Sequence, residues 1–190
     1  MNSSKGTLRV IGGKYRSRLI RVPSLRGLRP TPDRVRETLF NWLGQDLTGL
    51  ACLDLFAGSG ALGFEAASRG AVRVVMVEKD RAAVAELERS RAALGAEQVA
   101  IIGSDAMVFL AKARERFDVV FLDPPFRQNA LPAILGNLPP HLEPGARVYV
   151  ESDAPMEPSS PWIELKRGKA GQVSYQLLQL LQWNANEGQP

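Results

Sequence analysis

The chain has 190 residues, of which 45% are hydrophobic and 23% charged, so it is long enough for one domain with a full hydrophobic core. No window approaches the roughly 20 consecutive apolar residues of a membrane span, and the N-terminus lacks the apolar stretch of a signal peptide. We therefore expect a cytoplasmic protein without membrane contact. With one cysteine, Cys52, and one histidine, His141, neither a disulfide framework nor a zinc site of the usual spacing can form, and we expect no metal.

Positive charge is concentrated at the N-terminus. The net charge is +4, but residues 1–36 hold ten Lys and Arg against one acid, Asp33, which leaves a negative balance over the remainder. A cationic segment on an acidic body suits a polyanion-binding protein, because each neutralised phosphate releases counterions. The sequence therefore predicts a basic arm over residues 1–30 that contacts a polyanion, and a body over residues 31–190. A solvated tail without function is the alternative.

In chain order, the first expected elements are two short strands, 8–11 and 18–22, which form a hairpin around Gly12 and Gly13. A helix follows, with Thr31 as its N-cap and Pro32 at its first helical position.

From residue 51, apolar strand-like runs alternate with helical patterns. The predicted strands are 52–56, 72–77, 99–102, 117–122 and 147–151, and the helices begin near residue 60 and span 80–94, 105–114 and 130–138. This alternation is typical of an α/β fold, a doubly wound, mainly parallel Rossmann-like sheet covered on both faces. Two further strands, 162–166 and 173–181, are expected to close the sheet as an antiparallel hairpin.

Acidic residues mark the ends of four predicted strands: Asp54, Glu78, Asp105 and Asp123. Ligands of open α/β sheets lie beyond the carboxyl ends of the strands, so these acids predict one shared binding crevice. One or two of them alone could be incidental surface acids.

A glycine-rich turn follows the first strand of the body. Gly58, Gly60 and Gly63 match G-x-G-x-x-G between a strand and a helix, which suits close approach of a ligand to free backbone N–H groups. Glu78, twenty residues after Gly58, is placed to accept hydrogen bonds from ribose hydroxyls. Because nicotinamide nucleotides and S-adenosylmethionine both carry a ribose, this pattern indicates a nucleoside cofactor without deciding which.

Asp54 and the run Asp123-Pro124-Pro125-Phe126 favour S-adenosylmethionine. A carboxylate at Asp54 is unfavourable beside a pyrophosphate but favourable beside an amino group. The Asp123 carboxylate and the Pro124 carbonyl are acceptors suited to an exocyclic amino group of a nucleobase, and Phe126 is suited to stack on that base. A rigid turn without chemistry is the structural alternative.

These motifs resemble known enzymes. The segment from Asp54 to Gly60 resembles motif I of class I S-adenosylmethionine-dependent methyltransferases, and the segment from Asp123 to Phe126 resembles motif IV of their amino-methylating branch. The segments 9–15, 28–43 and 171–175 are similar to the bacterial RsmD family, and the similarity extends over roughly residues 8–181. One departure is Ser17, where members of that family often carry glycine.

The resemblance implies a monomeric enzyme that methylates N2 of guanine 966 in 16S ribosomal RNA, within the small ribosomal subunit or its assembly intermediate. It implies a class I fold and S-adenosylmethionine as the cofactor. The implied catalytic residues are Asp123, Pro124 and Phe126. The implied cofactor-binding residues are Asp54, Phe56, Gly58, Ser59, Gly60, Glu78, Lys79, Asp105, Ala106, Arg29 and Thr31. The cations expected to contact RNA are Lys14, Arg16, Arg18, Arg21 and Arg26.

Three other functions stay open from the residues alone. Motif IV also serves enzymes that methylate N6 of adenine in RNA or DNA. A nicotinamide-dependent oxidoreductase explains the glycine loop, but only 67 residues follow Asp123, and no substrate domain is apparent in them. A non-catalytic RNA-binding module leaves the run after Asp123 unexplained.

Overall fold

The computed structural model describes residues 6–22, 32–125 and 130–181. In these ranges one sheet has the strand order β5-β4-β3-β6-β7-β9-β8, and a separate hairpin has the order β1-β2. The strands are β1 (Thr7–Arg9), β2 (Leu19–Arg21), β3 (Ala51–Asp54), β4 (Arg73–Glu78), β5 (Val99–Gly103), β6 (Phe117–Leu122), β7 (Leu142–Ser152), β8 (Trp162–Ala170) and β9 (Val173–Leu180). The helices are α1 (Asp33–Leu43), α2 (Ala61–Ser68), α3 (Arg81–Leu94), α4 (Ala106–Lys112), α5 (Leu131–Asn137) and the short 3-10 helix η2 (Pro139–His141).

The sheet confirms the predicted doubly wound topology. The chain enters at β3 in the middle, moves outward through β4 to β5, and returns to β6 on the other side of β3. The strands from β3 to β7 are parallel, while β9 runs antiparallel to both β7 and β8. The reversal of direction between β3 and β6 creates a switch point, where open sheets of this kind bind their ligands.

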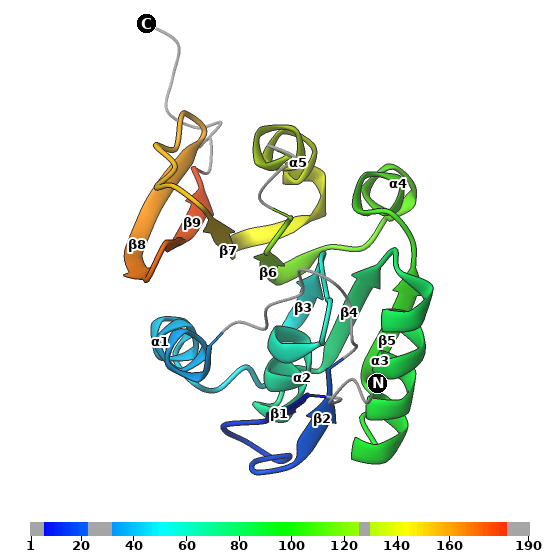
Figure 1. The fold of residues 1–190 in the computed structure, drawn as a ribbon. Helices are drawn as coiled ribbons and strands as arrows, with labels where there is room; N and C mark the ends of the chain where they lie inside the picture. Colours follow the sequence, from blue (N-terminus) through cyan, green and yellow to red (C-terminus); the bar gives the residue numbers. More distant parts are fainter. Residues whose placement is uncertain (1–5, 23–31, 126–129, 182–190) are drawn as a thin grey trace, which may run out of the picture.

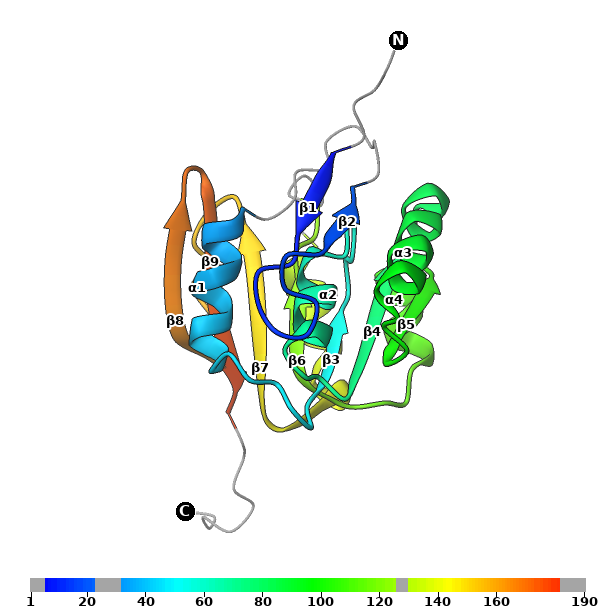
Figure 2. The same cartoon turned by 90° about the horizontal axis from the view of Figure 1, so that it is seen from below.

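Helices cover both faces of the sheet (Figures 1 and 2). One core cluster joins α1, α2 and α3 to the first face, and a second joins α4 and α5 to the opposite face. The strand residues alternate between these clusters, as in β6, where Phe121 belongs to the first and Leu122 to the second. No helix within the described ranges is long and apolar enough to cross a membrane.

Helix ends differ from the sequence expectation by one or two residues. α1 begins at Asp33, and Pro32 has φ −57° and ψ 148°, so it precedes the helix instead of occupying its first position. The predicted cap, Thr31, lies outside the described residues. α3 begins one residue later than predicted because the Asp80 side chain caps it, accepting from the N–H groups of Ala82 and Ala83.

The described part of the predicted arm packs onto the body. Leu8, Val10, Tyr15 and Ile20 are buried in the same cluster as residues of α1, α2 and α3. Ser17, in the hairpin turn, has φ 67°, a left-handed conformation that favours glycine. The hairpin thus shares a hydrophobic core with the helices that cover the sheet.

Candidate active site

The glycine-rich turn between β3 and α2 is shaped by its glycines. Gly58 and Gly60 have φ values of 52° and 78°, which other residues adopt only at a cost. Gly63 lies in the first turn of α2, where an added Cβ would stand 2.3 Å from the Met76 side chain, so glycine allows α2 to lie close against β4. The Gly58 N–H donates to the Glu78 carboxylate at 2.9 Å, which ties the turn to the end of β4.

Asp54 supports the start of α2 from the neighbouring strand. The residue before α2 is Gly60, which has no capping side chain. Instead, Asp54 Oδ2 accepts from the Gly63 N–H at 3.0 Å. A carboxylate near the first turn of a helix is also stabilised by the positive end of the helix dipole. Asp54 therefore has a structural contact as well as a place in the crevice.

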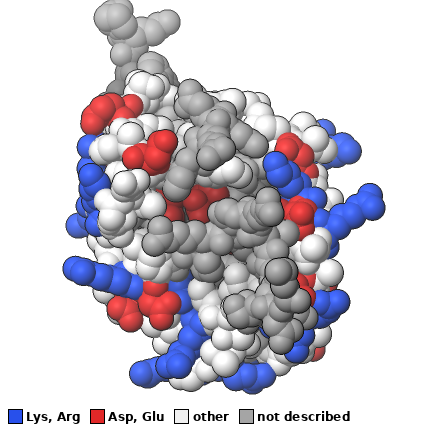
Figure 3. All heavy atoms as spheres, in the orientation of Figure 1, with Lys and Arg blue, Asp and Glu red and all other residues white. Residues whose placement is uncertain are grey.

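A pocket opens at the carboxyl ends of β3, β4 and β6. Its empty space is about 810 Å³ when the open solvent at its mouth is included. Figure 3 shows acidic atoms gathered in the hollow at the centre of this face. The predicted residues that line the pocket are Asp54, Phe56, Gly58, Ser59, Glu78, Lys79, Asp105, Ala106 and Asp123.

The other predicted site residues have different positions. Gly60 shapes the turn beside the pocket, and Pro124 is buried directly after Asp123. Pro125 lines the pocket, although the prediction gave it no role. Phe126, Arg29 and Thr31 lie outside the described residues.

Two predicted acids at the pocket also have structural roles. The Asp105 side chain caps α4 by accepting from the Met107 N–H at 2.9 Å. Glu78 accepts from the Gly58 N–H with one oxygen and from the Asp80 N–H with the other. An ionised carboxylate has about four acceptor positions, so Glu78 keeps capacity for a ligand.

Burial perturbs the acids at the pocket. It raises the pKa of Asp54 to about 7, against the opposing effect of the N–H groups of Gly63 and Phe56. Burial, followed by the negative charges of Glu151 and Asp54, raises the pKa of Asp123 well above its usual range. The surroundings thus disfavour the ionised forms of both carboxyl groups, and a bound cation would favour them.

Glu151, which the sequence prediction missed, belongs to the same group of acids. It is buried at the carboxyl end of β7 and accepts a hydrogen bond from the Tyr149 hydroxyl at 3.0 Å. Its charge acts on both Asp54 and Asp123. A sequence pattern could have identified it, because Glu151 is the last residue of a predicted strand and Asp123 directly follows another.

A second missed group joins the hairpin to the body. Glu65 of α2 is fully buried and accepts from the N–H groups of Ile11 and Gly12. It also forms ion pairs with Arg36 at 3.3 Å and Arg69 at 2.9 Å. The prediction counted Arg36 among the cations of the basic segment, whereas its guanidinium is buried in this network.

The predicted RNA-contacting cations divide between two ends of the hairpin. At its tip, the Lys14 N–H donates to the carbonyl of Ser68, the last residue of α2, and Arg18 donates to the carbonyl of Ala93 in the last turn of α3. Since α3 starts beside the pocket and rises about 1.5 Å per residue, its last turn lies about 20 Å away. Arg21 pairs with Thr7 at the open end, which Figure 2 shows on the side to which the arrowheads of β3 and β7 point. Arg26 lies outside the described residues.

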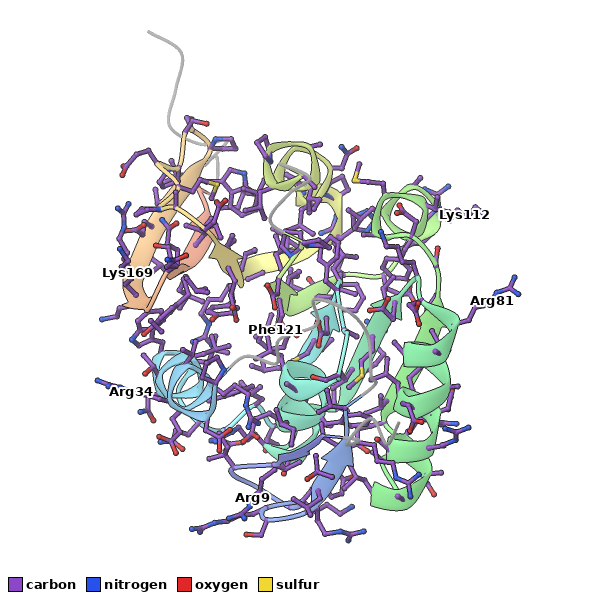
Figure 4. All side chains as sticks on the ribbon, in the orientation of Figure 1. Arg9, Arg34, Arg81, Lys112, Phe121 and Lys169 are labelled. Atoms are coloured by element: carbon purple, nitrogen blue, oxygen red, sulfur yellow. The ribbon has the colours of Figure 1, made fainter. Side chains whose placement is uncertain are left out.

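Cations also stand around the rim of the molecule. Figure 4 shows Phe121 in the interior, while Arg34, Arg81, Lys112 and Lys169 point outward from different elements. Cys52, by contrast, is a core residue: burial raises the pKa of its thiol to about 12, so it is not a nucleophile.

The pocket fits a nucleoside cofactor that carries positive charge. Backbone N–H groups of the glycine turn and the Glu78 carboxylate suit a carboxylate and a ribose, respectively. The buried Asp54 and the half-buried Asp123 favour a cation and disfavour a pyrophosphate.

The fold is that of a methyltransferase. A solved Streptococcus mutans protein described as an S-adenosylmethionine-dependent methyltransferase has the same fold, with a TM-score of 0.72 at 15% identity over 94% of this chain and 56% of the other. The Escherichia coli methyltransferase structure described as yhhF is much more similar. Its TM-score is 0.84 at 44% identity, covering 92% of this chain and 98% of that one.

Sequence comparison identifies the family. Residues 8–179 match the family described as Conserved hypothetical protein 95. The Ribosomal RNA small subunit methyltransferase D of Escherichia coli is 44% identical over 184 residues, which cover 94% of this chain and 92% of the relative. The Haemophilus influenzae protein of the same name is 42% identical over 93% of this chain and 96% of the relative. The chain belongs to the ribosomal RNA small subunit methyltransferase D family, and it is a methyltransferase.

Proposed function

We propose that this enzyme transfers a methyl group from S-adenosylmethionine to the exocyclic N2 of a guanine in 16S ribosomal RNA, at the position that the family resemblance gives as guanine 966. The observation that carries the proposal is the place of Asp123. It stands in the wall of the nucleoside pocket at the end of β6, directly before two prolines. Relatives named for the small-subunit ribosomal RNA, up to 44% identical, support the substrate class.

Different residues of the pocket bind different parts of the cofactor. Glu78 receives the ribose hydroxyls, and the segment at Asp105 and Ala106 meets the adenine. Asp54 and the glycine turn receive the amino and carboxylate groups of the methionine end. When bound, S-adenosylmethionine supplies an electrophilic methyl group on a sulfonium sulfur.

Asp123 and Pro124 act on the amino group of the base. The Asp123 carboxylate and the Pro124 carbonyl accept its two N–H donors, which favours a pyramidal nitrogen whose lone pair is free to attack. As the bond from N2 to the methyl carbon forms, the bond from sulfur to that carbon breaks, and its electron pair stays on sulfur. The raised pKa of Asp123, caused first by burial, suits it to take the proton that N2 then releases.

The RNA is held outside the pocket by cations. The basic hairpin contacts phosphates without reading their sequence, since phosphate contacts position a substrate and base contacts specify it. The substrate is the small ribosomal subunit or its assembly intermediate, and the enzyme acts as a monomer in the cytoplasm.

The test supplies isotopically labelled S-adenosylmethionine and small subunits from cells that lack the modification. Digestion of the RNA and mass spectrometry then identify the labelled nucleoside, with free 16S RNA as a parallel substrate. Labelled N2-methylguanosine is expected, and only from the subunit sample. Labelled N6-methyladenosine overturns the proposal in favour of adenine methylation, and equal labelling of free RNA overturns the subunit as substrate.

A further inference from the structure

The turn of the β8–β9 hairpin lies at the same edge of the sheet as the pocket. β9 is antiparallel to both β7 and β8, so β8 runs in the same direction as β7 and its last residues reach the carboxyl edge. Figure 2 shows this turn and the start of α1 at the edge to which the arrowhead of β7 points. The segment 171–175, which carries part of the family resemblance, forms the turn and the start of β9. The described residues that line the pocket include none of its members, so its place at this edge is explained by a role outside the pocket.

The strand register places Lys169 of β8 close to the level of Asp123. Lys169 pairs with Ser174 of β9, and Ser174 pairs with Ser152 of β7. In the pairing of β6 with β7, the residue level with Asp123 directly precedes Ser152. β8 is the third strand from β6, and strands lie about 4.8 Å apart, so the backbones of Asp123 and Lys169 are about 14 Å apart. This is about the length of four stacked nucleotides of one strand.

Two cations at this edge are unpaired in the part of the chain that the structure describes. Lys169 and Arg34, in the first turn of α1, are exposed, and neither side chain has an ion-pair or hydrogen-bond partner there. Figure 4 shows both pointing outward on the same side of the molecule. Their neighbours differ, because Arg167 pairs with two glutamates and Arg36 is buried beside Glu65. The helix dipole disfavours a cation in the first turn, so Arg34 does not serve to stabilise α1.

Aromatic packing fixes the end of β8 against α1. A Cβ added to Gly168 would stand 2.4 Å from the ring of Tyr175, so the bare backbone of β8 lies directly against that ring. The Tyr175 ring in turn packs 5.4 Å from that of Trp42 in α1. The two elements that carry the unpaired cations are therefore held in a fixed relation to each other.

We propose that Lys169 and Arg34 form a second RNA-binding surface, which binds phosphates of the strand that carries the target guanine. The β1–β2 hairpin packs against α2 and α3, which cover β3, β4 and β5, whereas α1 and β8 belong to the other half of the sheet. Asp123 follows β6, between these two halves.

Contacts on both sides of the target nucleotide have a physical purpose. Taking one base out of its stack costs a few kcal/mol, and phosphate contacts fix the register and orientation of the strand without reading its sequence. The chain after residue 36 has a net negative charge, so unpaired cations at this edge are not a general property of its surface. Phosphate groups provide the charge that complements them.

The inference rests on the proposed function, so binding and methylation are measured separately. Lys169→Gln, Arg34→Gln and the double variant are compared with Lys112→Gln as the matched control. Lys112 is also exposed and unpaired within the described residues, and Figure 4 shows it pointing outward from α4. That helix starts beside the pocket at Asp105, and Lys112 lies in its last turn, about 10 Å farther away.

Affinity for small subunits that lack the modification is measured over a range of salt concentrations, with S-adenosylhomocysteine present and with naked 16S RNA as a second probe. We expect each single substitution to raise Kd about threefold and to lower the salt slope by about 0.7–0.9 unit, and the double variant to add both effects. In methylation assays the loss should appear in KM. Lys112→Gln should change Kd by less than about 1.5-fold, and Tm should stay within about 2 °C in every variant.

Three results overturn the second RNA-binding surface. These are an unchanged Kd and salt slope in the double variant, a loss in Lys112→Gln as large as in Lys169→Gln, and a loss with subunits but none with naked RNA. The third result assigns the two cations to an acidic protein of the subunit. If binding changes as expected but the labelled nucleoside is not N2-methylguanosine, the proposed function fails while the surface stands.

Discussion

The carboxylates of Glu65, Asp54 and Asp123 differ in what surrounds them. Glu65 accepts four hydrogen bonds, from the N–H groups of Ile11 and Gly12 and from the guanidinium groups of Arg36 and Arg69. Both of its oxygens are therefore engaged, and two cations balance its charge. This acid fastens the hairpin and α1 to α2.

Asp54 and Asp123, which line the pocket, are in a different environment. Burial raises the pKa of Asp54 and of Asp123, and the charges that act on each come from further acids. The comparison teaches that burial alone does not mark a functional carboxylate. Glu65 has two cations beside it within the protein, whereas Asp54 and Asp123 line a pocket that a cationic ligand can enter.

Removing Asp123 is expected to have the largest effect. Asp123→Ala deletes both the acceptor for the amino group and the proton acceptor, so kcat should fall by about 10³-fold, while affinity for S-adenosylhomocysteine stays within about threefold. Single-turnover kinetics and calorimetry measure the two quantities. A parallel loss of cofactor affinity assigns Asp123 to the cofactor site and contradicts its catalytic role.

Glu65→Gln should chiefly destabilise the fold. The carboxamide turns an N–H donor toward groups that are themselves donors, and it leaves the buried Arg36 with the Asp33 carboxylate as its remaining ion-pair partner. We expect the free energy of unfolding to fall by about 3 kcal/mol, which lowers Tm by about 6–12 °C for a chain of this size. Thermal and denaturant unfolding measure this change. An unchanged Tm would show that the ion pairs and hydrogen bonds of Glu65 make no net contribution to the free energy of unfolding, and would contradict a structural role for Glu65.

The same chemical change at Asp54 should have the opposite sign. Its folded-state pKa of about 7 is above the ordinary value of 3.8, so protonation favours the folded state. The stability that Asp54 contributes is present below about pH 4 and is lost as the pH rises through about 7. Asp54→Asn should therefore raise Tm of the cofactor-free protein at pH 8 by about 2–4 °C, or about 1 kcal/mol.

The pH profile supplies the control for this prediction. The wild type should lose stability between about pH 4 and pH 7, and Asp54→Asn should lose less. With saturating S-adenosylhomocysteine, the variant should gain less stability than the wild type because it binds more weakly. If Asp54→Asn instead lowers Tm at pH 8, the hydrogen bond from the Gly63 N–H stabilises the fold by more than the burial of the charge destabilises it. Asp54 is then a structural acid, as Glu65 is.

The sequence predicted the fold well because its signals are local. Apolar runs of strand length alternate with helical patterns, and that alternation allows few topologies. The glycine turn was likewise readable, since a strand, two glycines and a helix occur within a dozen residues. Small boundary errors, such as the start of α1 after Pro32, arise because a proline at this point suits both the first helical position and the residue before it.

The ion-pair network of Glu65 could not be predicted from the sequence, because its members are far apart along the chain. Arg36 and Glu65 are 29 residues apart, and no local pattern links them, so the sequence places Arg36 only among the cations of the basic segment. Glu151 was missed differently. The pattern that marks Asp54 and Asp123, an acid at the carboxyl end of a predicted strand, also holds for Glu151 at the end of the strand 147–151.

The smallest expected effect concerns the hairpin, where Arg16 and Arg21 are matched exposed arginines at opposite ends. Arg21 lies at the open end on the side of the pocket, whereas Arg16 lies at the tip near the end of α2. Arg21→Gln should raise KM for the subunit about threefold and lower the salt slope of binding by about one unit, while Arg16→Gln changes KM by less than about twofold. Equal effects of the two substitutions would mean that both ends of the hairpin contact the RNA. An unchanged salt slope in both variants would mean that the hairpin only stabilises the fold, through its backbone contacts with Glu65.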